Sequence, residues 1–314
     1  MKSIFIDGHS GTTGLELQER LAGREDLELL LIDAELRKDA TAKKQLAAQA
    51  DLVVLCLPDE AAVEAVELYK DLGCKILDAS TAHRTNPAWA YGLPELSPEQ
   101  RGKISGAPLV ANPGCYPTGF LLLVAPLVRA GLLPADYPVV VHAMSGYSGG
   151  GRQMIEDYEQ EIDSSWAARI YGLDLKHKHK PEMFSHSGLS RAPIFVPQVA
   201  DFRQGMLVQV ALHRDLLGLK SPDALVEIGA IWEQAYGQER FIEPLEGPSL
   251  SALDGKFLAA TALNGTNRVE LMRFGQEDQI LLCARLDNLG KGASGAAVQN
   301  LNLMLDLEES LGLD

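Results

Sequence analysis

A single cysteine stands among residues that could make it a nucleophile. Cys115 lies in the segment 112–118, Asn-Pro-Gly-Cys-Tyr-Pro-Thr. Pro117 suits the first turn of a helix, where its missing N–H costs no hydrogen bond, and the apolar segment 120–129 continues as helix. We therefore expect Cys115 at or just before a helix N-terminus. Because the helix dipole favours an anion there, the position favours the thiolate, which is the nucleophilic form.

The other three cysteines have different surroundings. Cys56, Cys74 and Cys283 lie in apolar, strand-like runs, where a thiol packs as a small hydrophobic group. No CxxC spacing occurs, so the sequence predicts neither a disulfide framework nor a metal site.

A glycine-rich loop follows the first predicted strand, residues 3–7, and precedes a predicted helix at 14–22. A strand, a glycine loop and a helix in this order bind a pyrophosphate at the helix N-terminus, although the GxxGxxG spacing here departs from GxGxxG. Gly11 would let the backbone approach the phosphates, and Gly14 would let the helix pack closely on the strand. The candidate cofactor ligands of this loop are Gly8, Ser10, Gly11, Thr12, Thr13 and Gly14.

The residues at and after the end of the second predicted strand do not decide between NAD and NADP as the cofactor. Asp33 ends that strand, where an acid would bind the ribose 2′-OH of NAD. Arg37 and Lys38 follow and could instead hold the 2′-phosphate of NADP.

Strands and helices alternate before Cys115. Runs rich in Val, Ile and Leu at 27–33, 51–57 and 75–79 are typical of parallel strands buried on both faces, and helices are expected at 40–49 and 59–72. This order predicts a doubly wound, Rossmann-type α/β domain.

The pattern changes after Cys115. We expect strands at 138–143, 194–200, 206–213, 268–274 and 279–288, and helices at 151–170, 222–236 and 293–311, the last of them amphipathic. Alternation at 206–213 is typical of a half-solvated antiparallel strand. The sequence thus predicts an α+β catalytic domain with a mixed, largely antiparallel sheet. The expected boundaries are 1–115 with 289–314 for the nucleotide-binding domain, and 116–288 for the catalytic and oligomerisation domain.

Composition limits the partners. The net charge of −15 argues against nucleic acid, and no apolar run is long enough to span a membrane. The N-terminus has no pattern of a secretory signal, so a cytoplasmic protein is expected. One basic cluster, 176–180, could attract an anionic substrate or could be a solvated loop.

Further segments carry a family resemblance. They are the glycine loop, 78–84 (DASTAHR), 91–95 (YGLPE), 112–118, 145–152, 177–182 and 288–295. With them the chain resembles the N-acetyl-γ-glutamyl-phosphate reductases, in the aspartate-semialdehyde dehydrogenase superfamily, in the shorter of that family's two forms. The resemblance implies NADPH-dependent reduction of N-acetyl-L-glutamyl 5-phosphate to the 5-semialdehyde, with release of phosphate, in arginine biosynthesis. It also implies a homo-oligomer, a dimer or a tetramer.

The resemblance implies that Cys115 forms a thioester that accepts a hydride. Many family members have a histidine at the position of Gln198, which cannot act as an acid or base at neutral pH. His179, with Glu182 nearby, or His142 would then take this role. Gln198 could still orient the substrate or donate a hydrogen bond, so we keep Cys115, His179 and Gln198 as the candidate catalytic residues.

Other candidate residues follow from the same segments and from the charge of the substrate. Arginine binds carboxylate and phosphate with paired hydrogen bonds. The candidate substrate-binding residues are Asn112, Arg84, Ser148, Arg152 and Arg203, and the further cofactor-binding residues are Arg37, Ser80, Lys291 and Gly292.

Two other functions stay open at this point. One is reduction of another acyl phosphate, aspartyl or aminoadipyl, by the same thiol chemistry. The other is a non-catalytic, nucleotide-binding regulatory protein, which would have no need of a reactive thiol.

Overall fold

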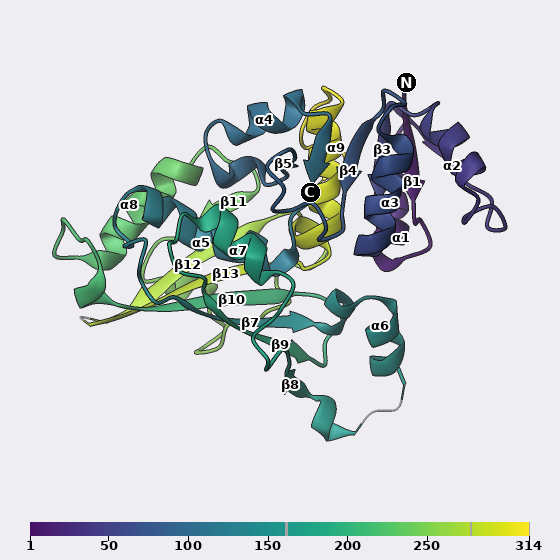
Figure 1. Ribbon diagram of the computed structural model, residues 1–314. Helices are drawn as coiled ribbons and strands as arrows, with labels where there is room; N and C mark the ends of the chain where they lie inside the picture. Colours follow the sequence, from purple (N-terminus) through teal and green to yellow (C-terminus); the bar gives the residue numbers. More distant parts are fainter. Residues whose placement is uncertain (161–162, 277, 314) are drawn as a thin grey trace. The chain divides into compact units, whose positions relative to one another are not determined.

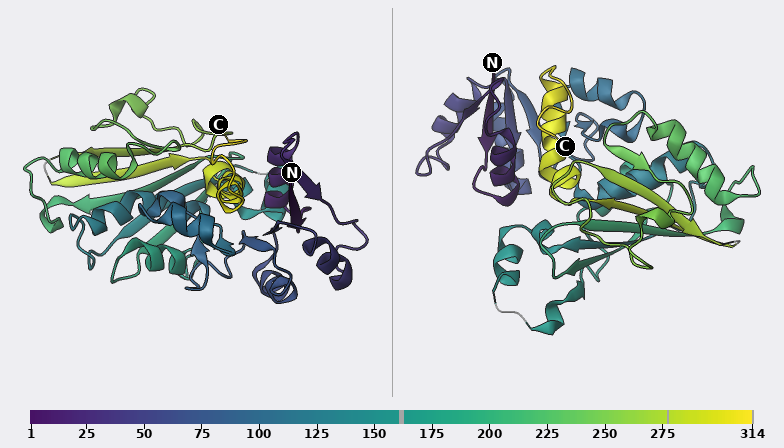
Figure 2. Two further views of the ribbon diagram at one scale, coloured as in Figure 1. Left: turned by 90° about the horizontal axis from the view of Figure 1, so that it is seen from above. Right: turned by 180° about the vertical axis from the view of Figure 1, so that it is seen from behind.

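The computed structural model describes residues 1–160, 163–276 and 278–313, shown in Figure 1 and Figure 2. Their contacts form two compact units. The first comprises 1–94, 99–113 and 293–313, and the second comprises 95–98 and 114–292. Cys115 therefore belongs to the second unit, not to the first as the expected boundary placed it, because it begins a helix that packs on the second sheet.

The first unit contains a parallel sheet in the order β2-β1-β3-β4-β6-β5. Its strands are β1 (Lys2–Asp7), β2 (Leu27–Leu30), β3 (Leu52–Leu55), β4 (Lys75–Asp78), β5 (Ala90–Tyr91) and β6 (Leu109–Ala111). β1, β3 and β4 are almost wholly buried, as the runs of aliphatic residues predicted.

Two groups of helices cover this sheet. They are α1 (Thr12–Leu21), α2 (Ala40–Ala47), α3 (Asp59–Tyr69), α4 (Gln100–Gly106) and α9 (Gly295–Met304). α2 and α3 share one apolar core with β1 and β3, whereas α9 packs against α1, α4 and β4. The predicted doubly wound fold is confirmed.

Two predicted elements of this unit differ in the structure. β2 ends at Leu30, so that Asp33 lies in an exposed segment beyond the strand. α9 ends at Met304 rather than 311, and all ten of its residues are buried. The prediction of an amphipathic helix was wrong because α9 packs against neighbours on several sides.

The second unit contains a mixed sheet in the order β11-β12-β13-β10-β7-β9-β8. Its strands are β7 (Val140–Gly146), β8 (Ala168–Ile170), β9 (Ile194–Ala200), β10 (Met206–His213), β11 (Ile242–Pro244), β12 (Val269–Gly275) and β13 (Gln279–Leu286). β7 pairs with β9 and β11 pairs with β12 in parallel, and the other neighbours are antiparallel.

Helices α5 (Cys115–Arg129), α7 (Lys180–Ser187) and α8 (Ala224–Tyr236) lie over one face of this sheet (Figure 1). α5 packs on β10, β12 and β13 and between α7 and α8, which explains why every residue from Tyr116 to Leu127 is buried. A Cβ at Gly119 would lie 2.8 Å from Cγ2 of Val208, so the glycine lets α5 approach β10 closely.

The long helix predicted at 151–170 was wrong. α6 spans only Arg152–Tyr158, a 3₁₀ turn spans Ser164–Trp166, and β8 follows; residues 161 and 162 lie outside the described residues. Asp163 accepts a hydrogen bond from the backbone N–H of Ser165 and so caps the 3₁₀ turn. The backbone of β8 pairs with β9, so residues 168–170 form a strand and not the end of a helix.

None of the described helices is both long enough and apolar enough to cross a membrane.

Candidate active site

Cys115 is the first residue of α5, as the sequence predicted. The backbone N–H of Gly114, the residue that caps the helix, donates to Oε1 of Glu182 at 2.8 Å. A Cβ at Gly292 would lie 2.8 Å from Cβ of Cys115, so only glycine fits at that contact. The half-buried thiol is thus held at a helix N-terminus, which favours an anion.

The other thiols lie in surroundings that disfavour the thiolate. Burial raises the pKa of Cys56 and of Cys283 to about 12, and it raises the pKa of Cys74 as well. For Cys56, the carboxylates of Asp78 and Asp7 add to the effect. These three cysteines are therefore poor nucleophiles at neutral pH.

Helix α7 carries two of the predicted chemical groups next to α5. His179 is the residue that caps α7, with Pro181 in the first turn, and Glu182 lies inside the helix. The His179 ring is 5.9 Å from the ring of Tyr116, the neighbour of Cys115, and both His179 and Glu182 are buried. The structure thus brings the candidate acid–base to the same end of α5 as the candidate nucleophile.

A chain of aromatic side chains continues from this point. The hydroxyl of Tyr171 donates to that of Tyr116 at 3.1 Å, and Tyr116 donates to the backbone carbonyl of Gln198 at 3.1 Å. The ring of His177 lies 4.9 Å from that of His179 and 5.1 Å from that of Phe195. Burial, with a smaller effect of Lys178, lowers the pKa of His177 to about 4, so its imidazole is neutral at pH 7.

The side chain of Gln198 points away from this cluster. Successive residues of a strand face opposite sides of the sheet, and Phe195, three residues earlier on β9, packs on Tyr116. The amide of Gln198 therefore lies on the other face, where its Nε2 is 3.4 Å from Nδ1 of His142. The catalytic role predicted for the Gln198 amide gains no support here, nor does the alternative of His142.

The loop that begins after β7 is fixed by buried hydrogen bonds. Nδ2 of Asn288 donates to the hydroxyl of Ser148 at 2.9 Å, and the backbone N–H of Gly205 donates to Oδ1 of Asn288 at 2.8 Å. Ser148, which was expected to bind substrate, is 2% exposed and accepts this internal bond. Sequence reasoning missed Asn288 as the residue that joins the two loops.

The two arginines expected at the substrate in this unit form surface ion pairs. Arg152 pairs with Glu156 at 2.7 Å, and its side chain is 75% exposed. Arg203 pairs with Glu159, and its side chain is 55% exposed. Solvent weakens such pairs, so both guanidinium groups could exchange their partners for an anion at small cost.

Lys291 and Gly292 lie in the second unit, and both are buried. The Lys291 ammonium is fully buried and donates to both carboxylate oxygens of Glu95, at 2.7 and 2.9 Å. A cofactor contact through the Lys291 ammonium would therefore have to replace this ion pair.

In the first unit, the predicted glycine loop joins β1 to α1 and is closely packed at Gly8 and Gly14. Gly8 has a φ of +90°, and a Cβ there would lie 2.4 Å from the backbone oxygen of Cys56. A Cβ at Gly14 would lie 2.6 Å from the oxygen of Gly8, so the glycine lets α1 pack closely on the loop that follows β1. At Gly11, the cap of α1, the nearest atoms would be 3.5 Å away, so packing does not require glycine there. No side chain of the described residues caps the N-terminus of α1, so its N–H groups could donate to a pyrophosphate.

Ser80, Arg84 and Asn112 are all buried in the first unit. The Ser80 hydroxyl donates to Asp78 at 2.7 Å, and Nη2 of Arg84 donates to the Ala79 carbonyl at 3.0 Å. Nδ2 of Asn112 donates to the Ala293 carbonyl at 3.1 Å. Arg37, like Asp33, is exposed in the segment between β2 and α2.

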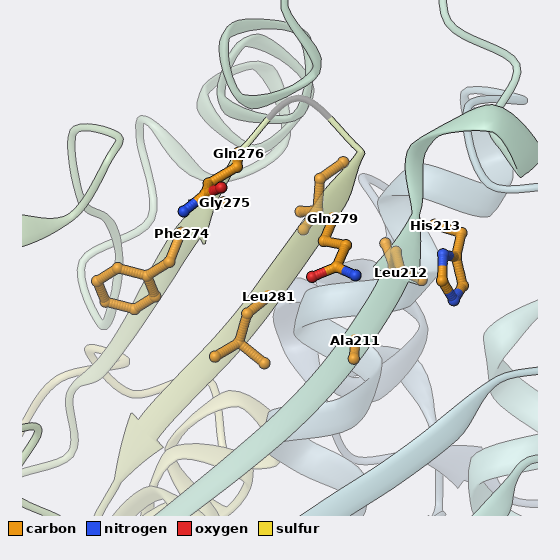
Figure 3. Close-up of a pocket in the computed structure, with 9 residues that line it drawn as sticks. Ala211, Leu212, His213, Phe274, Gly275, Gln276, Gln279 and Leu281 are labelled. Atoms are coloured by element: carbon orange, nitrogen blue, oxygen red, sulfur yellow. The ribbon is translucent and has the colours of Figure 1, made fainter.

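A pocket of about 510 Å³ lies at one end of β10, β12 and β13 (Figure 3). His213, Phe274 and Gln279 are among its lining residues. None of the predicted site residues lines it.

Comparisons with known proteins identify the family. Residues 115–288 match the family model described as semialdehyde dehydrogenase, dimerisation domain, and residues 32–104 match semialdehyde dehydrogenase, NAD binding domain. The chain is 52% identical to N-acetyl-gamma-glutamyl-phosphate reductase 2 of a Nostoc species, over 99% of this chain and 98% of that protein. It belongs to the N-acetyl-gamma-glutamyl-phosphate reductase family.

Other relatives agree with this membership. The N-acetyl-gamma-glutamyl-phosphate reductase of Brucella ovis is 49% identical over 96% of this chain and 98% of that protein. Among solved structures, aspartate semialdehyde dehydrogenase II of Vibrio cholerae in complex with ASA superposes with a TM-score of 0.70 at 17% identity, over 98% of each chain. The enzyme of Francisella tularensis superposes with a TM-score of 0.72 at 15% identity, over 97% of this chain and 100% of that chain. At these identities the two structures support the fold alone.

Proposed function

We propose that this family member reduces N-acetyl-L-glutamyl 5-phosphate to the 5-semialdehyde and releases phosphate, in arginine biosynthesis. The observation that carries the proposal is the placement of Cys115 at the N-terminus of α5, beside Glu182 and Gly292. The names of the relatives supply the substrate.

The chemistry at Cys115 follows from the acyl phosphate. The thiolate attacks the acyl carbon, and the C–O bond to phosphate breaks with its electron pair leaving on phosphate. The product is a thioester on Sγ, which is more easily reduced than an amide or a carboxylate. The helix N-terminus stabilises the thiolate both before the attack and when the aldehyde is released.

His179 is the proposed acid–base. It would accept the thiol proton before the attack and hydrogen-bond the oxyanion that forms at the reduced carbon. Its burial beside the ring of Tyr116, at the end of α5 where Cys115 lies, supports this role. The hydrogen bond from the Gly114 N–H to Glu182 would hold α7, and with it His179, in a fixed position relative to Cys115.

A nicotinamide cofactor fits the first unit. When bound, its reduced form supplies a hydride. The backbone of the loop from Gly8 to Gly14 and the uncapped N-terminus of α1 would hold the pyrophosphate. We propose NADP rather than NAD because Arg37 and Lys38 are exposed beyond β2 and could pair with a 2′-phosphate.

The proposal also covers the oligomeric state and the cellular location of the protein. The match to a dimerisation domain supports a homo-oligomer, which we propose as a dimer or a tetramer. We also propose a cytoplasmic location, where the four thiols of this chain would remain reduced.

The reverse reaction tests the function. N-acetylglutamate 5-semialdehyde, phosphate and NADP should give phosphate-dependent formation of NADPH. The signal should vanish in Cys115→Ser and persist in the control Cys74→Ser, whose thiol has a raised pKa. Activity on aspartate semialdehyde instead would show that the substrate is aspartyl phosphate and not the N-acetylglutamyl phosphate. No activity with either aldehyde would favour a non-catalytic protein.

A further inference from the structure

A small cavity of about 200 Å³ in the second unit is lined in part by Tyr116, the residue after Cys115. Tyr116, at the start of α5, forms part of its wall, and Ser145 and Val199 line it near the ends of the parallel strands β7 and β9. Met154 from α6 and Tyr171 complete the enclosure. Burial is the main cause that raises the pKa of Tyr171 to about 12, so its hydroxyl keeps its proton at pH 7 and can donate a hydrogen bond.

Polar and apolar groups line the cavity in similar measure. Tyr116, Met154 and Val199 offer an aromatic ring, a thioether and a branched aliphatic side chain. The hydroxyl of Tyr171 and the backbone of Gly149 and Gly150 supply the hydrogen-bonding groups. This combination suits a short acyl group joined to an amide, because the methyl group needs apolar contact and the amide needs a few polar partners.

The charges around the cavity favour a neutral amide over a free amine. No Asp or Glu is among the residues described as lining it, and Lys178 brings a positive charge to its edge. The ring of His177 also lines it and is neutral at pH 7 because burial lowers its pKa. An α-ammonium group would meet repulsion from Lys178 without a carboxylate to pair with, whereas a neutral amide meets no such cost.

We propose that this cavity, the acyl pocket, receives the N-acyl group of the substrate, and that Met154 and Val199 set the size of the acyl group that the enzyme accepts. The inference rests on the proposed function, since it assumes the N-acetylated substrate. It adds to that function the residues that distinguish an α-acylamido substrate from one with a free α-amine.

The test compares semialdehyde substrates that differ only in the acyl group. N-acetyl- and N-butyrylglutamate 5-semialdehyde are supplied with phosphate and NADP, and the ratio of their kcat/KM values is measured. Met154→Ala and Val199→Ala enlarge the pocket, so each should shift the ratio about tenfold towards the butyryl substrate, as expected for one or two methylene groups in an apolar pocket. A ratio cancels any change in thiol reactivity that affects both substrates equally.

Matched controls lie on the other face of the same sheet. Met144 is on β7 and Val196 is on β9, and neither lines the pocket. A shift of about threefold or more in either pocket variant, with Met144→Ala and Val196→Ala below that value, supports the inference. Smaller shifts in both pocket variants, or equal shifts in the controls, overturn it. A wild-type protein inactive on the acetyl substrate would overturn the proposed function and this inference with it.

Discussion

The carboxylate of Glu182 accepts a hydrogen bond from the backbone N–H of Gly114 at 2.8 Å, and this bond joins helix α7 to the residue before Cys115. Glu182 lies three residues after His179, so one turn of helix carries both the group that fixes α5 and the candidate acid–base. The orientation of the nucleophile and that of its partner thus depend on the same buried side chain.

We expect Glu182→Gln to lower kcat by about tenfold or more, since a small displacement of reacting groups is costly in rate. A neutral amide still accepts a hydrogen bond, but a weaker one than a carboxylate does. Steady-state kinetics with the acetyl substrate checks this. The control is Glu233→Gln on the exposed side of α8, and equal rates for the two variants would contradict the role of Glu182.

Selective alkylation follows from the contrast between the thiols. At pH 7 we expect iodoacetamide to modify Cys115 at least about tenfold faster than Cys56, Cys74 or Cys283, because burial raises the pKa of those three. Peptide mass spectrometry over a time course measures the four rates in the folded protein. Equal rates at the four cysteines would contradict the assignment of Cys115 as an activated thiol.

A further prediction concerns the hydrogen bond between Ser148 and Asn288. Asn288→Ala leaves the Gly205 N–H without its acceptor and should lower the free energy of unfolding by about 1–3 kcal/mol. Ser148→Ala removes only one of the two bonds and should cost less. Urea unfolding of both single variants and of the double variant measures their coupling, and strict additivity would contradict a shared bond.

Stability should depend on pH through His177. Burial lowers its pKa from 6.5 to about 4, so between these values the unfolded chain binds a proton that the folded chain does not. The free energy of unfolding therefore falls as pH decreases from 6.5 to 4, and this contribution is constant above 6.5 and below 4. His177→Asn should reduce the slope in urea titrations across this range; identical slopes would contradict the shift.

The sequence correctly predicted the elements that are determined by a local pattern of residues. The aliphatic runs placed β1, β3 and β4, and Pro117 placed the start of α5 at Cys115. It failed where tertiary contacts decide. The long helix after Gly151 was predicted because its residues suit a helix, yet β8 pairs with β9 instead.

The site was predictable in part for the same reason. Motif and helix position were enough to propose Cys115 and the glycine loop, but the direction of a side chain on a strand requires its register. The amide of Gln198 faces away from Tyr116, which its position in the sequence did not reveal. Asn288 joins loops that are far apart in the chain, and no spacing rule identifies such a residue.

The thioester on Cys115 is the central claim, and a reaction without phosphate tests it most directly. With N-acetylglutamate 5-semialdehyde and NADP alone, oxidation should stop after the acyl group reaches the thiol. We predict a burst of NADPH of about one equivalent per active site and a hydroxylamine-sensitive acyl group on the peptide that contains Cys115. Neither should form in Cys115→Ser. A burst without an acylated Cys115, or continued turnover in the serine variant, would contradict the account.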